Sequence, residues 1–149
     1  MIESELAPSV DSIRARAERE STRPRVLIVD DDDLVLASLQ SLFRFESGYE
    51  LDVETNPSKA VQLLSTKRFD VVISDLLMPE MDGIQLLETA AKLQPEATRI
   101  LLTGYGDGRR IRTAVRELGL HYIDKPWDNA AILKIVRSDL RKRVRADRR

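Results

Sequence analysis

The stretch VVISDLLMPEMDG at residues 71–83 decides the fold of this chain. It opens with a short apolar run, which is typical of a strand buried on both faces of a sheet, and the run ends in one carboxylate, Asp75. Pro79 then forces the chain to turn, and Asp82 and Gly83 complete a tight loop before a segment with helical spacing. A buried strand, an acidic end, a tight loop and a helix form one unit of an α/β protein.

The same unit recurs along the chain. Apolar runs predict strands at residues 26–29, 51–55, 71–74, 99–103 and 121–124. Helical spacing predicts helices at residues 34–45 (with Gly48 as the stop), 56–64, 83–93 and 111–118, and a last helix capped by Asp128 or Asn129. Short strands that alternate with helices predict the α/β class, with a doubly wound, five-stranded parallel sheet.

The ends of the chain differ from this repeating part. We expect residues 1–23 to be an N-terminal extension, 24–140 the domain, and 141–149 a basic tail that continues the last helix. Apolar residues recur at helical spacing in the extension, at Leu6, Val10, Ile13 and Ala17. They fit either a helix that docks on a partner or a frayed, partly helical tail.

Composition excludes several classes of function. The chain has no cysteine and a single histidine, His121, which excludes thiolate nucleophiles, cysteine metal sites and a multi-histidine cage. No apolar run approaches the length of a membrane span, and the first residues do not resemble a signal peptide, so we expect a cytoplasmic protein with no membrane partner. The net charge of -1 and the lack of a recognition motif make nucleic acid an unexpected partner, despite the basic tail.

Acidic residues gather where the first and third strands end. Asp30 to Asp33 follow the first strand, and Asp75 ends the third. Ligand sites of such sheets lie beyond the carboxyl ends of the strands, so these carboxylates are expected to converge. Negative charges this close need a compensating positive charge, and Mg²⁺, which binds oxygen ligands, is the simplest ion to supply it. We assign metal binding to Asp30 and Asp31, and helix capping to Asp32 and Asp33.

Two further strand ends complete the candidate site. Thr103 ends the fourth strand and offers a hydroxyl donor, with Gly104 leaving space beside it. Lys125 follows the fifth strand and is a compact cation that can pair with Asp75. Pro126 comes directly after the lysine and is a candidate for a cis peptide bond.

Four motifs together resemble the receiver domain of two-component response regulators. VLIVDD, SDLLMPEMDG, LLTG and YIDKPW occur in that family's order within residues 24–140. The KPW triplet, with Trp127, resembles one subgroup of the family. The resemblance implies the chemotaxis-regulator-like, flavodoxin-like (βα)5 fold with strand order 2-1-3-4-5.

The resemblance also implies a role for each matching residue. Asp75 would be the phosphoacceptor, with Mg²⁺ held by Asp31 directly, by Asp30 through water, by Asp75 and by the backbone carbonyl of Leu77. Thr103 would be the switch hydroxyl, Lys125 the phosphoryl-binding lysine and Tyr122 the switch aromatic residue.

A phosphorylation-dependent signalling switch follows from these roles, rather than an enzyme with turnover on other substrates. The donor would be a sensor histidine kinase or a phosphotransfer protein, since the chain has no GK[ST] phosphate loop. Phosphorylation would change the face formed by residues 111–118, 121–124 and the last helix. This face would control a downstream protein partner or output domain, or it would form a homodimer. A homodimer could also form through the terminal helices. Arginines near the face would pair there with acids of a second copy: Arg109, Arg110, Arg112 and Arg116.

Two alternatives stay open from sequence. A haloacid-dehalogenase-like phosphatase would use Asp31, Asp33 and Val35 as its DxDx[TV] motif, with Thr103 and Lys125 in later motifs. That reading lacks a well-placed late acidic pair and leaves SDLLMPEMDG unexplained. The other alternative is a scaffold that keeps the receiver fold without being phosphorylated.

Overall fold

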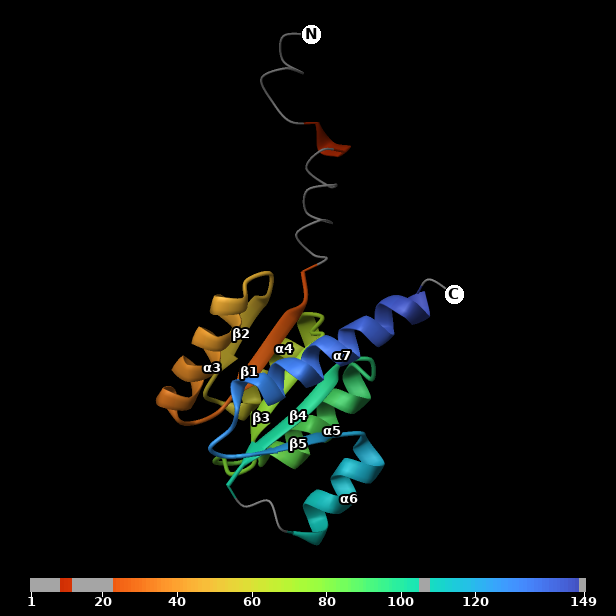
Figure 1. Cartoon of the computed structure of the whole chain (residues 1–149). Coiled ribbons are helices and arrows are strands. Elements are labelled where there is room, and N and C mark those ends of the chain that lie inside the picture. Colours follow the sequence, from red (N-terminus) through yellow and green to blue (C-terminus); the bar gives the residue numbers. More distant parts are fainter. Residues whose placement is uncertain (1–8, 12–22, 105–107, 148–149) are drawn as a thin grey trace.

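The computed structural model describes residues 9–11, 23–104 and 108–147, and within them it forms one parallel sheet. The strands are β1 (Arg25–Val29), β2 (Glu50–Glu54), β3 (Val71–Asp75), β4 (Thr98–Thr103) and β5 (His121–Asp124). The helices are α3 (Asp33–Glu46), α4 (Pro57–Thr66), α5 (Gly83–Leu93), α6 (Arg109–Leu118) and α7 (Asn129–Asp147). The strand order β2-β1-β3-β4-β5, with every pairing parallel, confirms the predicted fold class (Figure 1).

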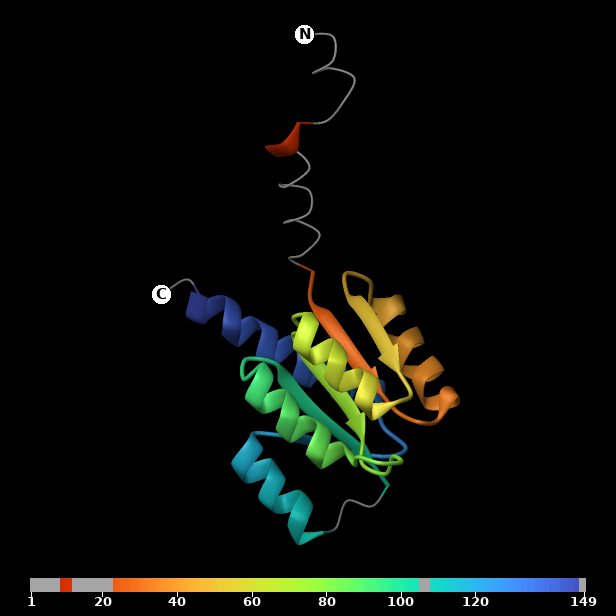
Figure 2. The same cartoon turned by 180° about the vertical axis from the view of Figure 1, so that it is seen from behind.

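Helices cover both faces of the sheet. Helices α3 and α7 lie on the face seen in Figure 1, and α4, α5 and α6 lie on the face seen in Figure 2. Alternation along the strands explains the two layers: Leu27 and Val29 of β1 pack toward α4 and α5, whereas Val26 and Ile28 pack toward α3 and α7. All four are fully buried, which is why β1 reads as a continuous apolar run.

Polar residues set where the helices begin. Asp32 caps α3 by accepting a hydrogen bond from the Leu34 N–H at 2.9 Å, as the sequence analysis expected. Asn56 caps α4, and Asp82 caps α5 through a capping box with Gln85.

Several predicted boundaries differ from the observed ones by one or two residues; α4, for example, ends at Thr66 rather than at residue 64. Helix α6 begins at Arg109 rather than at 111, because apolar spacing marks only the buried face and its first two residues are exposed. Helix α3 ends at Glu46, one residue beyond the predicted end, and its C-cap Ser47 has φ 55°, just before Gly48 at φ 83°. Strand β2 covers Glu50–Glu54, so it stops before the predicted residue 55.

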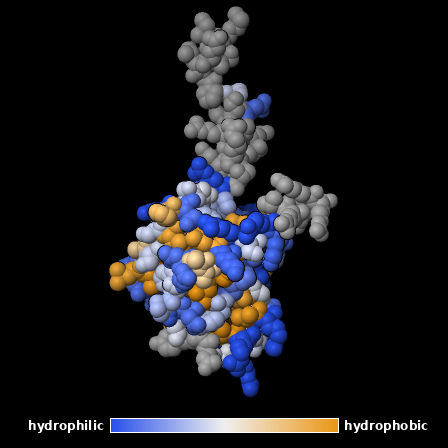
Figure 3. All heavy atoms as spheres, viewed as in Figure 1, coloured by the Kyte–Doolittle hydropathy of each residue, from blue (hydrophilic) through white to orange (hydrophobic). Residues whose placement is uncertain are grey.

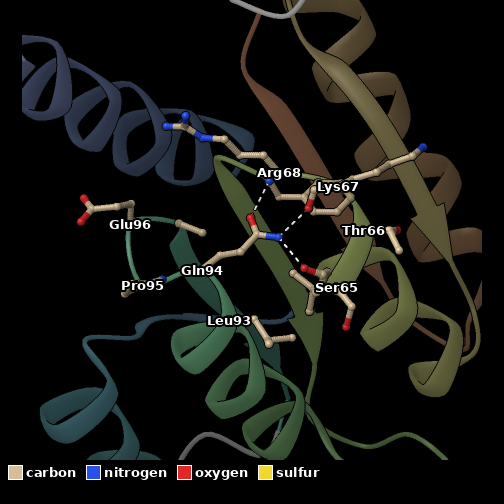
Figure 4. A pocket seen from close by; sticks show the side chains of 11 residues that line it. Ser65, Thr66, Lys67, Arg68, Leu93, Gln94, Pro95 and Glu96 are labelled. Atoms are coloured by element: carbon tan, nitrogen blue, oxygen red, sulfur yellow. Dashed lines mark hydrogen bonds between the residues drawn. The ribbon is translucent and has the colours of Figure 1, made fainter.

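The Gln94 side chain joins two helices at the amino-terminal end of the sheet, opposite the carboxyl ends of the strands. The Gln94 amide oxygen accepts from the Phe69 N–H at 2.6 Å, and its nitrogen donates to the carbonyls of Leu64 at 2.8 Å and Lys67 at 2.6 Å (Figure 4). These bonds join the end of α4 to the end of α5. A surface pocket of about 510 Å³ lies beside them.

Polar contacts at the same end of the sheet hold α7 against the strands and the loops before them, also beyond residue 140. The Arg143 guanidinium donates to the Asp70 carboxylate at 3.0 Å and to its carbonyl at 2.7 Å. Asp139 accepts from the Thr98 hydroxyl at 2.9 Å and lies 3.1 Å from the His121 ring nitrogen. Helix α7 is therefore fixed along the whole sheet.

Some sequence expectations fall outside the described residues. These are most of the helical spacing in residues 1–23 and the end of the basic tail at 148–149; residues 105–107 are also not described. Within the described part of the chain, no helix combines the length and apolar character that a membrane crossing requires.

Candidate functional site

Three carboxylates meet at the carboxyl end of the sheet. Asp30 directly follows β1 and Asp75 ends β3, and these strands are paired so that Val29 lies opposite Ser74. One oxygen from each of Asp30, Asp31 and Asp75 lies within 4.8 Å of the others. Asp30 is buried, Asp75 is half-buried and Asp31 is exposed, so the cluster is open to solvent on one side. The structure thus brings together the three acids that the sequence analysis grouped.

Asp30 is the most constrained of the three. It is 2% exposed, and its carboxylate accepts from the Asp32 N–H at 2.9 Å and from the Lys125 ammonium at 3.0 Å. Burial raises the pKa of Asp30 and the negative charge of Asp75 adds to this, while the Asp32 N–H and Lys125 offset only part of the shift. The ionised carboxylate therefore costs free energy unless a further positive charge approaches it.

Lys125 bridges the two inner carboxylates. Its Nζ lies 3.0 Å from Asp30 Oδ2 and 3.1 Å from Asp75 Oδ1. Burial acts to lower the pKa of Lys125, but the hydrogen bonds and charges of Asp30 and Asp75 outweigh it and raise that pKa. The peptide bond from Lys125 to Pro126 is cis. Three carboxylates against one ammonium still leave an excess of negative charge.

The remaining predicted residues lie on β4, on β5 and in the loop after β3. Thr103 is fully buried at the end of β4, and its carbonyl accepts from the Lys125 N–H at 3.1 Å. Leu77 lies in the loop two residues after Asp75 with its side chain 52% exposed. Tyr122 on β5 is partly buried, and its hydroxyl donates to the Asp124 carboxylate. The metal role of the Leu77 carbonyl and the switch roles of Thr103 and Tyr122 stay predictions.

Gly83 is a site residue whose importance the sequence analysis missed. A Cβ at this position would lie 2.0 Å from the carbonyl oxygen of Asp75 and 2.9 Å from Leu101 Cδ1. Its N–H also donates to the Leu76 carbonyl at 2.8 Å. The first residue of α5 therefore rests directly on the backbone of the candidate phosphoacceptor. The sequence signal was the Asp-Gly pair, which we read only as a turn.

Arg110 has a different partner from the one expected. The sequence analysis offered it to acids of a second copy, but its guanidinium lies 2.5 Å from the Asp82 carboxylate of the same chain. The hydrogen bond to Asp82 raises the pKa of Arg110. Burial acts to raise the pKa of Asp82, but the bond to Arg110 contributes to a net lowering of that pKa. Sequence spacing does not reveal a pair between an exposed and a half-buried side chain that lie far apart along the chain.

Known proteins share this arrangement. The model of the response regulator receiver domain family matches residues 26–137. The chain is 32% identical over 116 residues to transcriptional regulatory protein GlrR of Escherichia coli, which covers 78% of this chain and 26% of that protein. It is 38% identical over 104 residues to two-component response regulator ARR12 of Arabidopsis thaliana, which covers 68% of this chain and 17% of that protein. The chain therefore spans about a quarter or less of these relatives.

Solved structures agree with the sequence relatives. The signal receiver domain of an HD domain-containing protein from Pseudomonas fluorescens has a TM-score of 0.76 and 36% identity, and covers 85% of this chain and 93% of that one. The CheY-like response regulator receiver domain protein from Methanospirillum hungatei has a TM-score of 0.77 and 29% identity, with coverage of 84% and 99%. None of these matches supports the phosphatase alternative. The chain belongs to the response regulator receiver domain family of two-component signalling.

Proposed function

We propose that this receiver domain accepts a phosphoryl group on Asp75 from a sensor histidine kinase or phosphotransfer protein, and that Mg²⁺ assists the transfer. The observation that carries the proposal is the convergence of three carboxylates with the Lys125 ammonium at one end of the sheet. It joins a nucleophile, a cation site and a phosphoryl-binding cation within a few ångströms.

The residues present suit Mg²⁺. The donor set consists of carboxylate oxygens, which this hard cation prefers, and the excess negative charge around buried Asp30 calls for a divalent ion. Asp31, Asp75 and the Leu77 carbonyl would hold the ion directly, and Asp30 would assist. When bound, it offsets the negative charge of the transferring phosphoryl oxygens.

The chain itself supplies the nucleophile and one positive charge. A carboxylate oxygen of Asp75 attacks phosphorus, the bond from phosphorus to the donor's histidine nitrogen breaks, and that nitrogen regains its lone pair. Lys125 already lies 3.1 Å from Asp75, so its ammonium is positioned to bind a phosphoryl oxygen as the charge arrives. Thr103, buried at the neighbouring strand end, supplies a second donor from its hydroxyl.

The output runs through α6, β5 and α7. As Thr103 bonds the phosphoryl group, Tyr122 fills the space beside it, and this shifts the population between two packings of that face. The face then binds a downstream protein partner or output domain, or a second copy of the chain. Helix α6 carries four exposed arginines at this face, Arg109, Arg110, Arg112 and Arg116, and Figure 3 shows hydrophilic atoms protruding at the lower right, where this helix lies.

Mass spectrometry of the intact chain tests the proposal. Incubation with acetyl phosphate and Mg²⁺ should add one phosphoryl mass to the wild-type chain and to Asp33→Asn, which changes an exposed acid at the start of α3. Asp75→Asn should gain none. A phosphatase-like reaction would instead depend on Asp31 as nucleophile, so a phosphoryl group on the Asp75→Asn chain would contradict the assignment. A wild-type chain that gains no mass and binds no beryllofluoride would be a scaffold.

A further inference from the structure

The first turn of α5 links the phosphoacceptor to helix α6. Gly83 packs on the Asp75 carbonyl, and Asp82 immediately before it is the N-cap of α5. One carboxylate oxygen of Asp82 accepts from the Gln85 N–H at 2.9 Å, and the other lies 2.5 Å from the Arg110 guanidinium. The Asp82 side chain is therefore shared between α5, which it caps, and α6, which it binds.

Helix formation alone does not explain an arginine at this place. Arg109 and Arg110 occupy the first turn of α6, where the positive end of the helix dipole disfavours cations. The turn contains no acidic residue, and the N-cap Gly108 makes no side-chain cap bond. The Asp82 carboxylate compensates the positive charge at this helix end from outside α6.

A small buried face and polar contacts at both ends hold α6 in place. Only Ile111 and Ala114 of this helix are buried, and a surface pocket of about 510 Å³ lies between it and α5. At its other end, Arg99 donates to the Leu118 carbonyl at 3.0 Å and 2.8 Å. One end of α6 is thus tied to the start of β4, and the other to the loop that follows the candidate phosphoacceptor.

We infer that Arg110 is a positioning residue for phosphorylation: it holds Asp82, and through Gly83 it fixes the backbone of Asp75. The inference rests on the proposed function of Asp75. An exposed ion pair contributes little to stability, about 0–1 kcal/mol, so the pair acts mainly on position. Coupling between two sites is reciprocal, so a phosphoryl group on Asp75 also changes how firmly α6 is held.

Phosphorylation kinetics of the full chain test the inference. The time course with acetyl phosphate and Mg²⁺ is followed by intact mass at several donor concentrations for Arg110→Gln, Asp82→Asn and the double variant. Arg116→Gln, on an exposed position of the same helix, is the control. Asparagine caps helices as well as aspartate does, so Asp82→Asn removes the ion pair without removing the cap.

We expect Arg110→Gln to lower the rate at saturating donor roughly threefold to tenfold, below the hundredfold loss that a full 1 Å misplacement can cause. The half-saturating donor concentration should not change, because Arg110 does not contact the donor. Arg110→Lys should restore part of the rate, and the double variant should be no slower than Asp82→Asn. A purely structural role would lower the melting temperature without this rescue or this non-additivity.

Three results would overturn the inference. The first is an unchanged or faster rate in Arg110→Gln, and the second is an equal loss in Arg116→Gln. The third is a rise in half-saturating donor concentration alone, which would mean that the arginine binds the donor. All three leave the proposed function intact, since it fails only when the wild-type chain accepts no phosphoryl group.

Discussion

Replacing Gly83 with alanine should disrupt the site from the backbone side. The new Cβ would lie 2.0 Å from the Asp75 carbonyl oxygen and 2.8 Å from its carbonyl carbon. Reaching an ordinary contact of about 3.4 Å requires a displacement of about 1.4 Å. Neither neighbour is a flexible side-chain tip, so α5 or the end of β3 must move.

The cost follows from these distances. Overpacking typically destabilises by about 1–3 kcal/mol, and a backbone clash belongs at the upper end of that range. Alanine gains at most about 1 kcal/mol over glycine in a helix interior, and less at the first helical residue. The net loss is about 2 kcal/mol or more, which lowers the melting temperature by roughly 6–10 °C for a domain of this size.

Function should fall further than stability does. A shift of more than 1 Å at Asp75 changes its separation from Lys125, and misplacement on this scale can cost about a hundredfold in rate. Circular dichroism melting and acetyl phosphate kinetics measure the two effects. Gly104→Ala is the matched control for the melting measurement, because a Cβ there meets nothing within 4 Å. A Gly83→Ala chain that melts and is phosphorylated like the wild type would refute the reasoning.

Three further predictions concern the charges and the strained loop. Without divalent ions at pH 7, Asp30→Asn should melt at a higher temperature than the wild type. The pKa of Asp30 is raised in the folded chain, so its ionised form opposes folding above the unfolded pKa. The difference in melting temperature should therefore vanish as the pH falls below about 4. Added Mg²⁺ should raise the melting temperature of the wild type more than that of this variant, and an equal response would count against the metal site. Lys125→Gln should lower the free energy of unfolding by about 2–4 kcal/mol, because two carboxylates lose their partner. The same variant should bind Mg²⁺ more tightly in calorimetry, and weaker binding would contradict this expectation. Glu80→Asn should stabilise by up to about 1 kcal/mol in denaturant melts, because residue 80 has φ 71° and asparagine tolerates this conformation; lower stability would show that the glutamate side chain matters more.

The sheet and its acidic site were predictable because the residues that follow parallel strands all lie at the same end of the sheet. Each apolar run ends in one polar residue, and the carboxyl ends of all strands meet at one edge of the sheet. Asp30, Asp75, Thr103 and Lys125 therefore had to lie near one another once the strands were recognised. The identity of the helix caps, such as Asp32, followed from local chemistry within a few residues.

Contacts between exposed polar residues on different elements were not predictable in the same way. Arg110 had many acids within reach in principle, and only the packing of α6 beside α5 selects Asp82. Gln94 is a similar case, since its three backbone partners come from a segment about 25 residues earlier in the chain. Gly83 showed a turn signal, but how closely α5 approaches Asp75 depends on the whole layer of helices.

The resting site already contains the positive charge that phosphorylation needs. Lys125 balances part of the charge of Asp30 and Asp75, and its raised pKa keeps it protonated at neutral pH. On the proposed function, an arriving phosphoryl group would add about -1.5 to -2 charge at Asp75, and the ammonium would exchange a carboxylate for a stronger anion within the same few ångströms. The response must then be carried by the less firmly held parts around it. Helix α6 has two buried side chains, fewer than each other helix in the described part of the chain, so it is the helix whose position such an exchange would change at the least cost.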